Sequence, residues 1–296
     1  METIMGKYRL NGYDGFSREE NFDLSKHSSI GIGCKAEIAF CPQSVTECVS
    51  LLQKLQFDGA VYCILGNLTN VLPPDEPIEK VIILTKNLNG IKSVESGVFA
   101  YAGVKSGTLL RFCKQNEYSG VEFLQGVPCT LGGALFMNAG VRGRYMNEVV
   151  DEVLVYREGE ICTLSNAECQ YAYKQSVFMR NKDVILGARL RLKKATAEEI
   201  TAKERAYACK RAHLPKGKSM GCVFKNPQGY IAGELIEKCG FKGRREGGAI
   251  VAQEHANFIL NEKGATARDV QRLIDEIKHA VFEEFGVILE EEIRRI

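Results

Sequence analysis

Several features of secreted, membrane and nucleic-acid-binding proteins are missing from this 296-residue sequence. No uninterrupted apolar run approaches the roughly 20 residues that a membrane-spanning helix needs. Residues 1–23 contain no apolar stretch of the kind found in a secretory signal. The net charge is only +2, from 39 Lys and Arg against 37 Asp and Glu, so the chain lacks the excess of positive charge that is typical of nucleic-acid-binding proteins. These absences predict a cytoplasmic protein that binds neither membranes nor nucleic acid.

Metal-binding and disulfide patterns are also missing. The chain has 11 cysteines but no C-x-x-C pair, and its 4 histidines are far apart in the sequence. This spacing argues against a zinc site and against a disulfide framework, so we expect no bound metal. In a reducing cytoplasm the cysteines stay as thiols, and most are expected to pack as small hydrophobic side chains.

Glycine, by contrast, is abundant, with 29 residues. The G-x-G-x-x-A pattern at residues 31–36 lacks the preceding buried strand and the following helix of a dinucleotide-binding turn, which favours a plain turn. Residues 120–140 are richer, and their adjacent Gly132 and Gly133 would let backbone N–H groups approach a bulky anion. A tight structural turn is the alternative. Residues 66–70 form a second polar loop directly after an apolar strand pattern.

The hydrophobic pattern predicts short strands and few helices up to about residue 192. Strands are expected at residues 36–40, 60–65, 81–84, 98–103, 149–156 and 184–192. Helices are expected from the capping pair Ser44/Glu47 to about residue 55 and over residues 107–116. Further helices are expected at residues 193–212, 232–239 and 266–285, the last with Thr266/Asp269 at its start and Gly286 at its end. Residues 287–293 alternate as a strand.

The change of composition after residue 192 suggests a domain boundary near residue 205. We expect a loosely attached N-terminal extension over residues 1–20, a first domain over residues 21–205 and a second over residues 206–296.

Eight segments stand out, in a fixed order along the chain. They are HSSIGIG (27–33), GNLTN (66–70), the glycine-rich residues 120–140, YAYKQSVF (171–178), GCVFKNP (221–227), the pattern at residues 235–243, HANFILN (255–261) and LEEEI (289–293). Each alone is a weak signal, but their order is specific. Together they resemble the UDP-N-acetylenolpyruvoylglucosamine reductase (MurB) family from about residue 22 to the C-terminus. The short chain resembles the compact subtype that lacks a substrate-covering insertion.

The resemblance implies an α+β fold of the MurB/PCMH-like flavoprotein type. In this family an FAD-binding region of two subdomains precedes a smaller α+β substrate-binding domain. The implied enzyme is an FAD-dependent NADPH oxidoreductase that reduces UDP-N-acetylglucosamine enolpyruvate to UDP-N-acetylmuramate for peptidoglycan synthesis. Hydride passes from flavin N5 to C3 of the enolpyruvyl group, and an enzyme acid protonates C2. The cofactor carries the redox step, and the protein supplies orientation, charge and one proton. A monomer is expected.

Three catalytic residues carry over from the family's motifs. Cys222 stands where the best-known members have the proton-donating Ser, and a thiol with an ordinary pKa of about 8.5 releases a proton more readily than an alcohol. Glu292 matches the second acid of the terminal motif. Lys174 stands where the family has an Arg that stabilises the enolate, so it keeps the charge but loses the bidentate fork. Neighbouring Arg180 is an alternative source of this charge.

The resemblance also assigns cofactor and substrate contacts. Lys225 and Asn226 are expected to bind the substrate's phosphates and sugar, although a polar turn is the alternative. Leu68 and Cys129 replace family glycines, which puts loop geometry or FAD affinity in doubt. The expected FAD-binding residues are Gly66, Asn67, Thr69, Asn70, Gly126, Val127, Pro128, Thr130, Gly132, Gly133, Asn138, Ala139 and Gly140.

Two other functions are consistent with these departures from the family pattern. One is a weakened or inactive paralogue that binds a nucleotide sugar or flavin in cell-wall metabolism. The other is a flavin oxidase of the same fold, which is less favoured because no flavin-linking His stands in the expected early loop. Asn257 is expected either to contact flavin or substrate, or to make a structural hydrogen bond.

Overall fold

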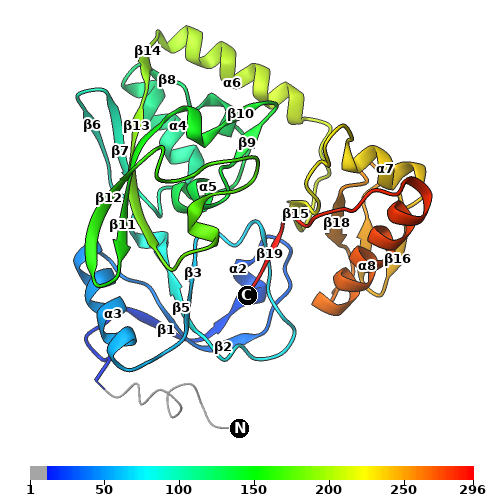
Figure 1. Cartoon of the computed structure of the whole chain (residues 1–296), viewed down its shortest axis with the longest axis horizontal. Coiled ribbons are helices and arrows are strands. Elements are labelled where there is room, and N and C mark those ends of the chain that lie inside the picture. The colour runs from blue at the N-terminus through cyan, green and yellow to red at the C-terminus, as the bar shows by residue number, and fades with distance from the viewer. Residues whose placement is uncertain (1–11) are drawn as a thin grey trace. The chain divides into compact units, whose positions relative to one another are not determined.

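A computed structural model describes residues 12–296 (Figure 1), and its internal contacts divide the chain into two units. Unit 1 comprises the residues up to Glu20, Ile38–Asn67 and Lys80–Ala212. Unit 2 comprises Asn21–Glu37, Leu68–Glu79 and His213–Ile296. Within residues 12–296, none of the helices is both long and apolar enough to cross a bilayer.

The largest sheet of unit 1 is antiparallel, with strand order β12-β11-β13-β7-β6. These strands are β6 (Ile91–Val94), β7 (Gly97–Tyr101), β11 (Val150–Arg157), β12 (Glu160–Ser165) and β13 (Val184–Arg191). Successive residues of β11 point to opposite faces, as the strand geometry requires. Val153 and Val155 pack with α4 (Ser106–Gln115) and α5 (Leu131–Phe136), whereas Leu154 and Tyr156 pack with α3 (Val45–Phe57). The sheet is therefore buried on both faces.

A second sheet of order β1-β2-β5-β3 completes the core around α3. Its strands are β1 (Arg18–Asp23), β2 (Lys35–Phe40), β3 (Tyr62–Leu65) and β5 (Val81–Leu84). β5 pairs in parallel with both β2 and β3, and all four of its residues are buried, which is typical of a central parallel strand. α3 begins at Ser44, whose hydroxyl accepts a hydrogen bond from the Glu47 N–H at 3.1 Å.

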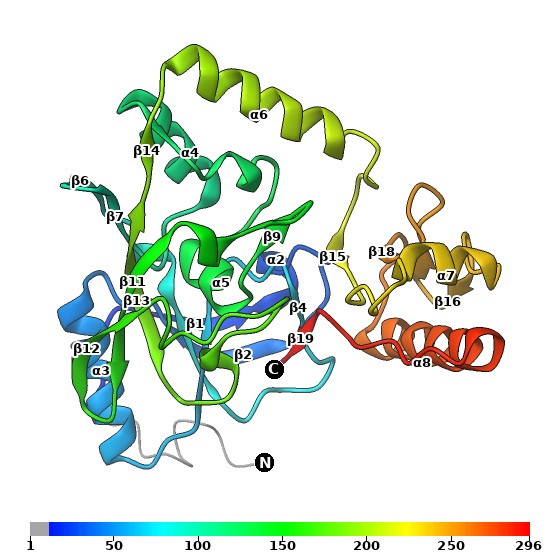
Figure 2. The same ribbon diagram turned by 45° about the horizontal axis from the view of Figure 1, so that its top comes forward.

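Unit 2 is built on a four-stranded sheet of order β15-β18-β17-β16. Its strands are β15 (Ser219–Cys222), β16 (Arg245–Glu246), β17 (Ala249–Val251) and β18 (Phe258–Asn261), and Figure 2 shows α7 (Ala232–Lys238) and α8 (Ala267–Phe285) beside it. The buried stripe of α8 faces this sheet and consists of Val270, Leu273, Ile274, Ile277 and Val281. α8 begins with the Thr266/Asp269 capping box and ends at Gly286, which has φ 64°.

The remaining elements are the 15-residue helix α6 and several shorter ones. The helices among them are α2 (Leu24–His27), α6 (Ala197–Arg211) and the 3₁₀ turns Thr85–Asn87, Glu122–Leu124, Met146–Glu148 and Val177–Met179. The two-residue strands are β4 (Val71–Leu72), β8 (Tyr118–Ser119), β9 (Gly140–Val141), β10 (Arg144–Tyr145), β14 (Lys193–Lys194) and β19 (Arg294–Arg295).

The structure confirms the six predicted strands of the N-terminal part and the five predicted helices, with shifts at their ends. The helix expected from residue 193 begins only at Ala197, after the cap at Thr196, because Lys193 and Lys194 pair with β8 as strand β14. Two further expectations are wrong. Residues 287–293 are extended but form only an isolated bridge, Phe224↔Glu291, instead of a continuous strand. The expected loose attachment of residues 1–20 does not hold for Tyr13 and Phe16, which pack into the core with Phe40, because their rings supply apolar surface to it. Residues 1–11 lie outside the described part of the chain.

The eleven cysteines are thiols, as expected, and their burial predicts a wide range of reactivity. Burial raises the pKa of Cys48 and of Cys113 to about 12, whereas Cys209 on α6 is exposed. Because the thiolate is the reactive form, we expect iodoacetamide at pH 8 to label Cys209 within minutes and to leave Cys48 and Cys113 unlabelled until denaturant is added. Peptide mass spectrometry measures this, with Cys209→Ser as the control. Labelling of Cys48 in the native protein would contradict the burial of α3.

Candidate active site

Cys222 lies at the end of β15, at an irregular point of the unit 2 sheet. Ser219 pairs with Leu260 and Cys222 pairs with Phe258, with a register shift between the two pairs. Gly221, inside that shift, has φ 79°, a conformation that glycine adopts without strain. Cys222 is half-buried. The irregularity interrupts the regular strand pattern directly before the predicted proton donor.

The extended segment that carries Glu292 lies directly beside the segment that follows Cys222. The Glu292 N–H donates to the Val223 carbonyl at 2.8 Å, and the Lys225 N–H donates to the Glu290 carbonyl at 2.9 Å. Leu289 and Ile293 of this segment are buried in the core of unit 2. The backbone directly after Cys222 is therefore paired with the backbone of the Glu292 segment, although Cys222 and Glu292 are 70 residues apart in the sequence.

Glu291 fixes this segment to α8. Its carboxylate accepts hydrogen bonds from Lys278 of α8 and from Arg295. Burial by itself would raise the pKa of Glu291, but the hydrogen bonds from Lys278 and Arg295 and their charges hold it below its usual range. The sequence pattern assigned no role to Glu291.

The polar loop at residues 68–70 also contacts the segment that carries Glu292. The Asn70 side-chain amide donates to the Glu292 carbonyl at 3.0 Å, and the Asn70 carbonyl accepts from the Arg294 N–H at 2.9 Å. β4 and β19 then continue as a parallel pair. Asn70, expected to bind cofactor, thus also holds the backbone of Glu292.

Leu68 has a backbone conformation that favours glycine. It has φ 48°, in the left-handed region, and its side chain is buried. Its carbonyl accepts a hydrogen bond from the Ser29 N–H at 3.2 Å. Thr69 follows it in the loop. The cost of the left-handed conformation for a residue with a Cβ is about 1 kcal/mol.

The predicted substrate residues have partners within unit 2. Lys225 Nζ lies 3.1 Å from a carboxylate oxygen of Glu290. The Asn226 side-chain oxygen accepts from the Ala232 N–H at 3.0 Å, which satisfies a backbone donor at the start of α7. Asn226 therefore has the structural role that the polar-turn alternative expected, and its contact with substrate stays a prediction.

In unit 1 the two glycine-bearing loops lie side by side. A Cβ on Gly66 would collide with the hydroxyl oxygen of Thr130, and the Asn67 side-chain amide donates to the Pro128 carbonyl at 2.9 Å. Gly126, Val127 and Pro128 form the turn that leads to α5. This close approach of the loops requires a glycine at position 66.

Gly132 and Gly133 open α5. The Gly132 N–H donates to the Ala102 carbonyl at 2.8 Å, and a Cβ on Gly132 would lie 3.0 Å from the Ala102 Cβ, so this glycine lets α5 lie against the end of β7. The Gly133 N–H reaches the Thr130 hydroxyl at 3.4 Å, a long hydrogen bond. Cys129 is accommodated without a left-handed backbone, and burial raises its pKa to about 11.

Lys174 lies in a tight turn that is fastened to the glycine-rich segment. Ala172 and Gln175 exchange two backbone hydrogen bonds of 3.1 Å around it, and Lys174 has φ 53°. Buried Asn138 donates to the Ala172 carbonyl at 2.9 Å, and the buried Ser176 hydroxyl donates to the Phe136 carbonyl at 2.6 Å. Ala139 and Gly140 follow α5 directly. The turn that presents Lys174 is thus anchored to the end of α5.

Arg180, the alternative source of positive charge, is exposed and donates to the Gln170 side chain at 2.7 Å. Sequence reasoning also left the role of Asn257 open. The structure supports the structural alternative, because buried Asn257 makes two hydrogen bonds to the backbone of Phe224. In the sequence, the position of Asn257 in the HANFILN segment was only a weak signal for this role.

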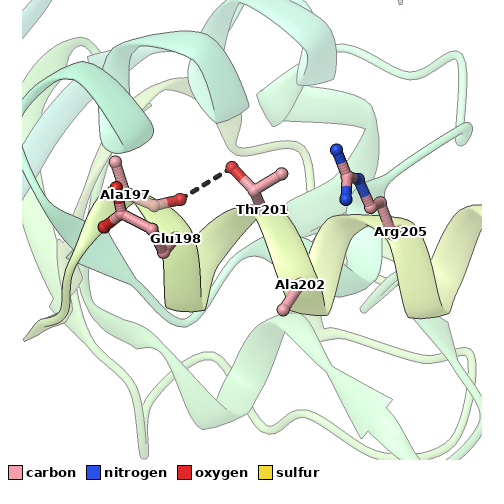
Figure 3. Close-up of a pocket in the computed structure, with 5 residues that line it drawn as sticks. All are labelled: Ala197, Glu198, Thr201, Ala202 and Arg205. Carbon is pink, nitrogen blue, oxygen red and sulfur yellow. Dashed lines mark hydrogen bonds between the residues drawn. The ribbon is translucent and has the colours of Figure 1, made fainter.

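A surface hollow of about 280 Å³ lies elsewhere, on α6 (Figure 3). A single helix supplies its lining residues, Ala197, Glu198, Thr201, Ala202 and Arg205. The Thr201 hydroxyl donates to the Ala197 carbonyl at 2.7 Å and so faces its own helix. None of these residues is a predicted site residue, and the hollow is not the candidate site.

Two family models match the chain. The model described as "UDP-N-acetylenolpyruvoylglucosamine reductase, C-terminal domain" covers residues 213–296, and the model described as "FAD binding domain" covers residues 36–165. Their order along the chain agrees with an FAD-binding region followed by a substrate-binding region.

Relatives with the same name align over most of their length. The UDP-N-acetylenolpyruvoylglucosamine reductase of Clostridioides difficile is 36% identical over 92% of this chain and 90% of its own. That of Thermotoga maritima is 37% identical over 91% of this chain and 95% of its own. The crystal structure of the Thermus caldophilus reductase (MurB) superposes with a TM-score of 0.81 at 31% identity, covering 95% of this chain and 98% of that one.

Replacement of Glu291 by Gln is expected to reduce the free energy of unfolding by about 1 kcal/mol at pH 7, because it removes the carboxylate that Lys278 and Arg295 bind. The pKa of Glu291 is lowered in the folded state, so its contribution is fully present above the unfolded pKa of about 4.3 and is lost as the pH falls through the lower folded value. Urea unfolding at pH 7 and at pH 3 measures this.

The exposed Glu283 on the same helix is the control, because Glu283→Gln removes an equal charge without these partners. Equal stability of Glu291→Gln and wild type at pH 7 would show that the contacts with Lys278 and Arg295 do not hold the segment.

Proposed function

The chain belongs to the UDP-N-acetylenolpyruvoylglucosamine reductase family, and we propose that it performs the family's reaction with Cys222 as the proton donor. It is an FAD-dependent oxidoreductase that uses NADPH to reduce UDP-N-acetylglucosamine enolpyruvate to UDP-N-acetylmuramate in peptidoglycan synthesis. The observation that carries the proposal is the pairing of the segment after Cys222 with the segment that bears Glu292.

The residues present fit FAD. In unit 1, Gly66 leaves room for two loops to meet, and these loops present Asn67 and the turn at residues 126–130 together. In unit 2, Thr69 and Asn70 lie in the loop that has a left-handed backbone at Leu68. When bound, FAD would supply the redox chemistry, that is, the transfer of a hydride from NADPH to C3 of the enolpyruvyl group. We propose that the remaining contacts come from Gly126–Pro128, Thr130, Gly132, Gly133 and Asn138–Gly140.

The protein's own residues then complete the reaction. Hydride addition at C3 places negative charge on the substrate's carboxylate and C2, and the Lys174 ammonium stabilises that charge. The Cys222 thiol gives its proton to C2 and becomes a thiolate, which regains a proton from solvent. Glu292 polarises the intermediate or assists this proton transfer. The sum is one hydride from NADPH and one proton from the enzyme, added across the carbon–carbon double bond.

Lys225 and Asn226 bind the phosphates and the sugar in this proposal. Glu290, 3.1 Å from Lys225, acts as a counter-ion when substrate is absent, and the more highly charged diphosphate displaces it. The substrate-binding domain is proposed to begin near residue 206, after an FAD-binding domain over residues 21–205 and an extension over residues 1–20. A monomer in the cytoplasm is proposed as well, and the eleven thiols support that location.

A flavin spectrum of the purified protein tests the function as a whole. The protein is expected to show bound flavin, to lose the visible absorbance on addition of NADPH, and to regain it under anaerobic conditions when UDP-N-acetylglucosamine enolpyruvate is added. Failure to bind FAD, or bleaching without recovery, would favour the alternative of a binding protein without this activity.

Cys222→Ala is expected to slow the recovery of flavin absorbance by about 100-fold or more, because general acid catalysis contributes roughly 10²–10⁴ in rate. Bleaching by NADPH is expected to stay at the wild-type rate, since that step needs no proton at C2. Stopped-flow absorbance measures both steps. Cys222→Ser is the matched control, and it is expected to retain most of the activity because the hydroxyl keeps a transferable proton.

Lys174→Arg is expected to raise turnover several-fold, because the guanidinium binds a carboxylate with two parallel hydrogen bonds. Lys174→Ala is expected to lower the rate of flavin recovery at least about 10-fold. Steady-state kinetics measure both variants, with the nearby Lys182→Ala as the control for the loss of a positive charge. Unchanged kinetics in Lys174→Ala would remove Lys174 from the mechanism.

A further inference from the structure

Asn257 is a buried polar residue with an unusual set of partners. Its side chain is 3% exposed, and it lies in the turn before β18. The side-chain oxygen accepts from the Phe224 N–H at 2.9 Å, and the side-chain amide donates to the Phe224 carbonyl at 2.8 Å. The Asn257 carbonyl also accepts from the Val223 N–H at 2.9 Å. One residue therefore satisfies three backbone groups of the two residues after Cys222.

The Asn257 side-chain amide makes the hydrogen bonds to Phe224 that a neighbouring strand would make in a regular sheet. β15 ends at Cys222, its last residue paired with β18, so residues 223 and 224 lie beyond the regular strand pairing. A carboxamide presents one donor and one acceptor side by side, the same arrangement as a residue in an antiparallel pair. Phe224 is 1% exposed, so without this amide its N–H and carbonyl would lose a partner in a site closed to water.

Neighbouring residues also hold Asn257 in place. Its N–H donates to Nδ1 of His255 at 3.2 Å, and burial lowers the pKa of His255, which keeps the imidazole neutral and able to accept. The His255 ring packs on Phe258, and a Cβ on Gly233 would lie 3.1 Å from it. The amide is thus held rigidly by α7 and β18.

Val223 and Phe224, which Asn257 contacts, also pair with the C-terminal segment at residues 291–292. The Val223 carbonyl accepts from the Glu292 N–H at 2.8 Å, and Phe224 forms the bridge with Glu291. A displacement of residues 223–224 would move both Cys222, one residue earlier, and Glu292, across the pairing. A shift of about 1 Å in a reacting group can cost about 100-fold in rate.

We propose that Asn257 is a positioning residue for the reaction, which sets the places of Cys222 and Glu292 by clamping the backbone of Phe224. The proposal rests on the proposed function of Cys222. Asn257 contacts neither flavin nor substrate in this account, and it acts only on the step that delivers the proton.

The test compares the two half-reactions in Asn257→Ala by anaerobic stopped-flow absorbance. The recovery of flavin absorbance with UDP-N-acetylglucosamine enolpyruvate is expected to slow at least 10-fold, whereas bleaching by NADPH stays within twofold of wild type. A merely structural role would lower FAD content and both rates together. Amide hydrogen exchange gives a readout independent of activity: peptides that contain residues 222–225 and 290–293 are expected to exchange at least 10-fold faster.

Asn261→Ala is the matched control. Asn261 also binds backbone groups through its amide, donating to the Ile30 carbonyl at 2.9 Å and accepting from the Ala265 N–H at 2.8 Å, and these groups lie outside residues 222–225. Its variant is expected to leave the rate of flavin recovery near the wild-type value. If Asn257→Ala does not fold, Asn257→Ser, which empties less volume, decides between the same outcomes.

Equal slowing of both half-reactions, or unchanged exchange in the two segments, would overturn the role of Asn257. Cys222→Ala, measured in parallel, separates this failure from the failure of the proposed function. If Cys222→Ala slows flavin recovery and Asn257→Ala does not, only the positioning role is wrong. If Cys222→Ala has no effect, the proton donor is wrong and the positioning role falls with it.

Discussion

The candidate site in unit 2 depends on one backbone pairing, between residues 223–225 and the extended segment 290–292. The hydrogen bonds from Lys225 to Glu290 and from Glu292 to Val223 join two segments that are distant in sequence and carry the two predicted acids. This pairing is too short to be stable alone, because two-stranded contacts are marginal in water. Side chains therefore hold it from several directions: Asn257 from the sheet, Lys278 from α8 and Asn70 from the loop before β4.

In unit 1, glycines and buried polar side chains hold the loops of the candidate site in place. Gly66 lets one loop approach Thr130, and Gly132 lets α5 lie against Ala102. Asn138 and Ser176 then fasten the turn of Lys174 to the end of α5. In both units the residues proposed to act on the substrate lie in short irregular segments, and buried hydrogen bonds, more than regular secondary structure, fix those segments.

The sequence predicted much of the regular structure because the signals are local. The stripe of α8, its Thr266/Asp269 box and Gly286 all appear where the spacing indicated. The four apolar residues of β5 indicated a buried strand in the same way. The strands β15 to β19 and the six-residue helix α5 were missed, since strands of two to four residues are too short to show a periodic pattern and the glycines of α5 suggest a turn.

The candidate site was predictable only in part. The order of the motifs located Cys222, Glu292 and Lys174, but it did not indicate which contacts hold these residues in position. Asn70 was expected to serve the cofactor and also binds the Glu292 backbone, and Glu291 had no assigned role although it ties the segment to α8. Asn70 and Glu292 are separated by 222 residues, so no local pattern indicates their contact. Glu291 and Lys278 are only 13 residues apart, but they lie on different elements whose packing the local pattern does not give. At Leu68 the sequence departs from a family glycine, and the structure shows that this leucine has a left-handed backbone, which favours glycine.

A double-mutant cycle on Cys222 and Asn257 tests the account most directly. The rate of flavin recovery with substrate is measured in wild type, Cys222→Ala, Asn257→Ala and the double variant. If the clamp on Phe224 acts by placing the proton donor, Asn257→Ala has little further effect once the thiol is gone, because residues that act as a unit are non-additive. Rate losses that multiply in the double variant would contradict the account, since the two residues would then act independently.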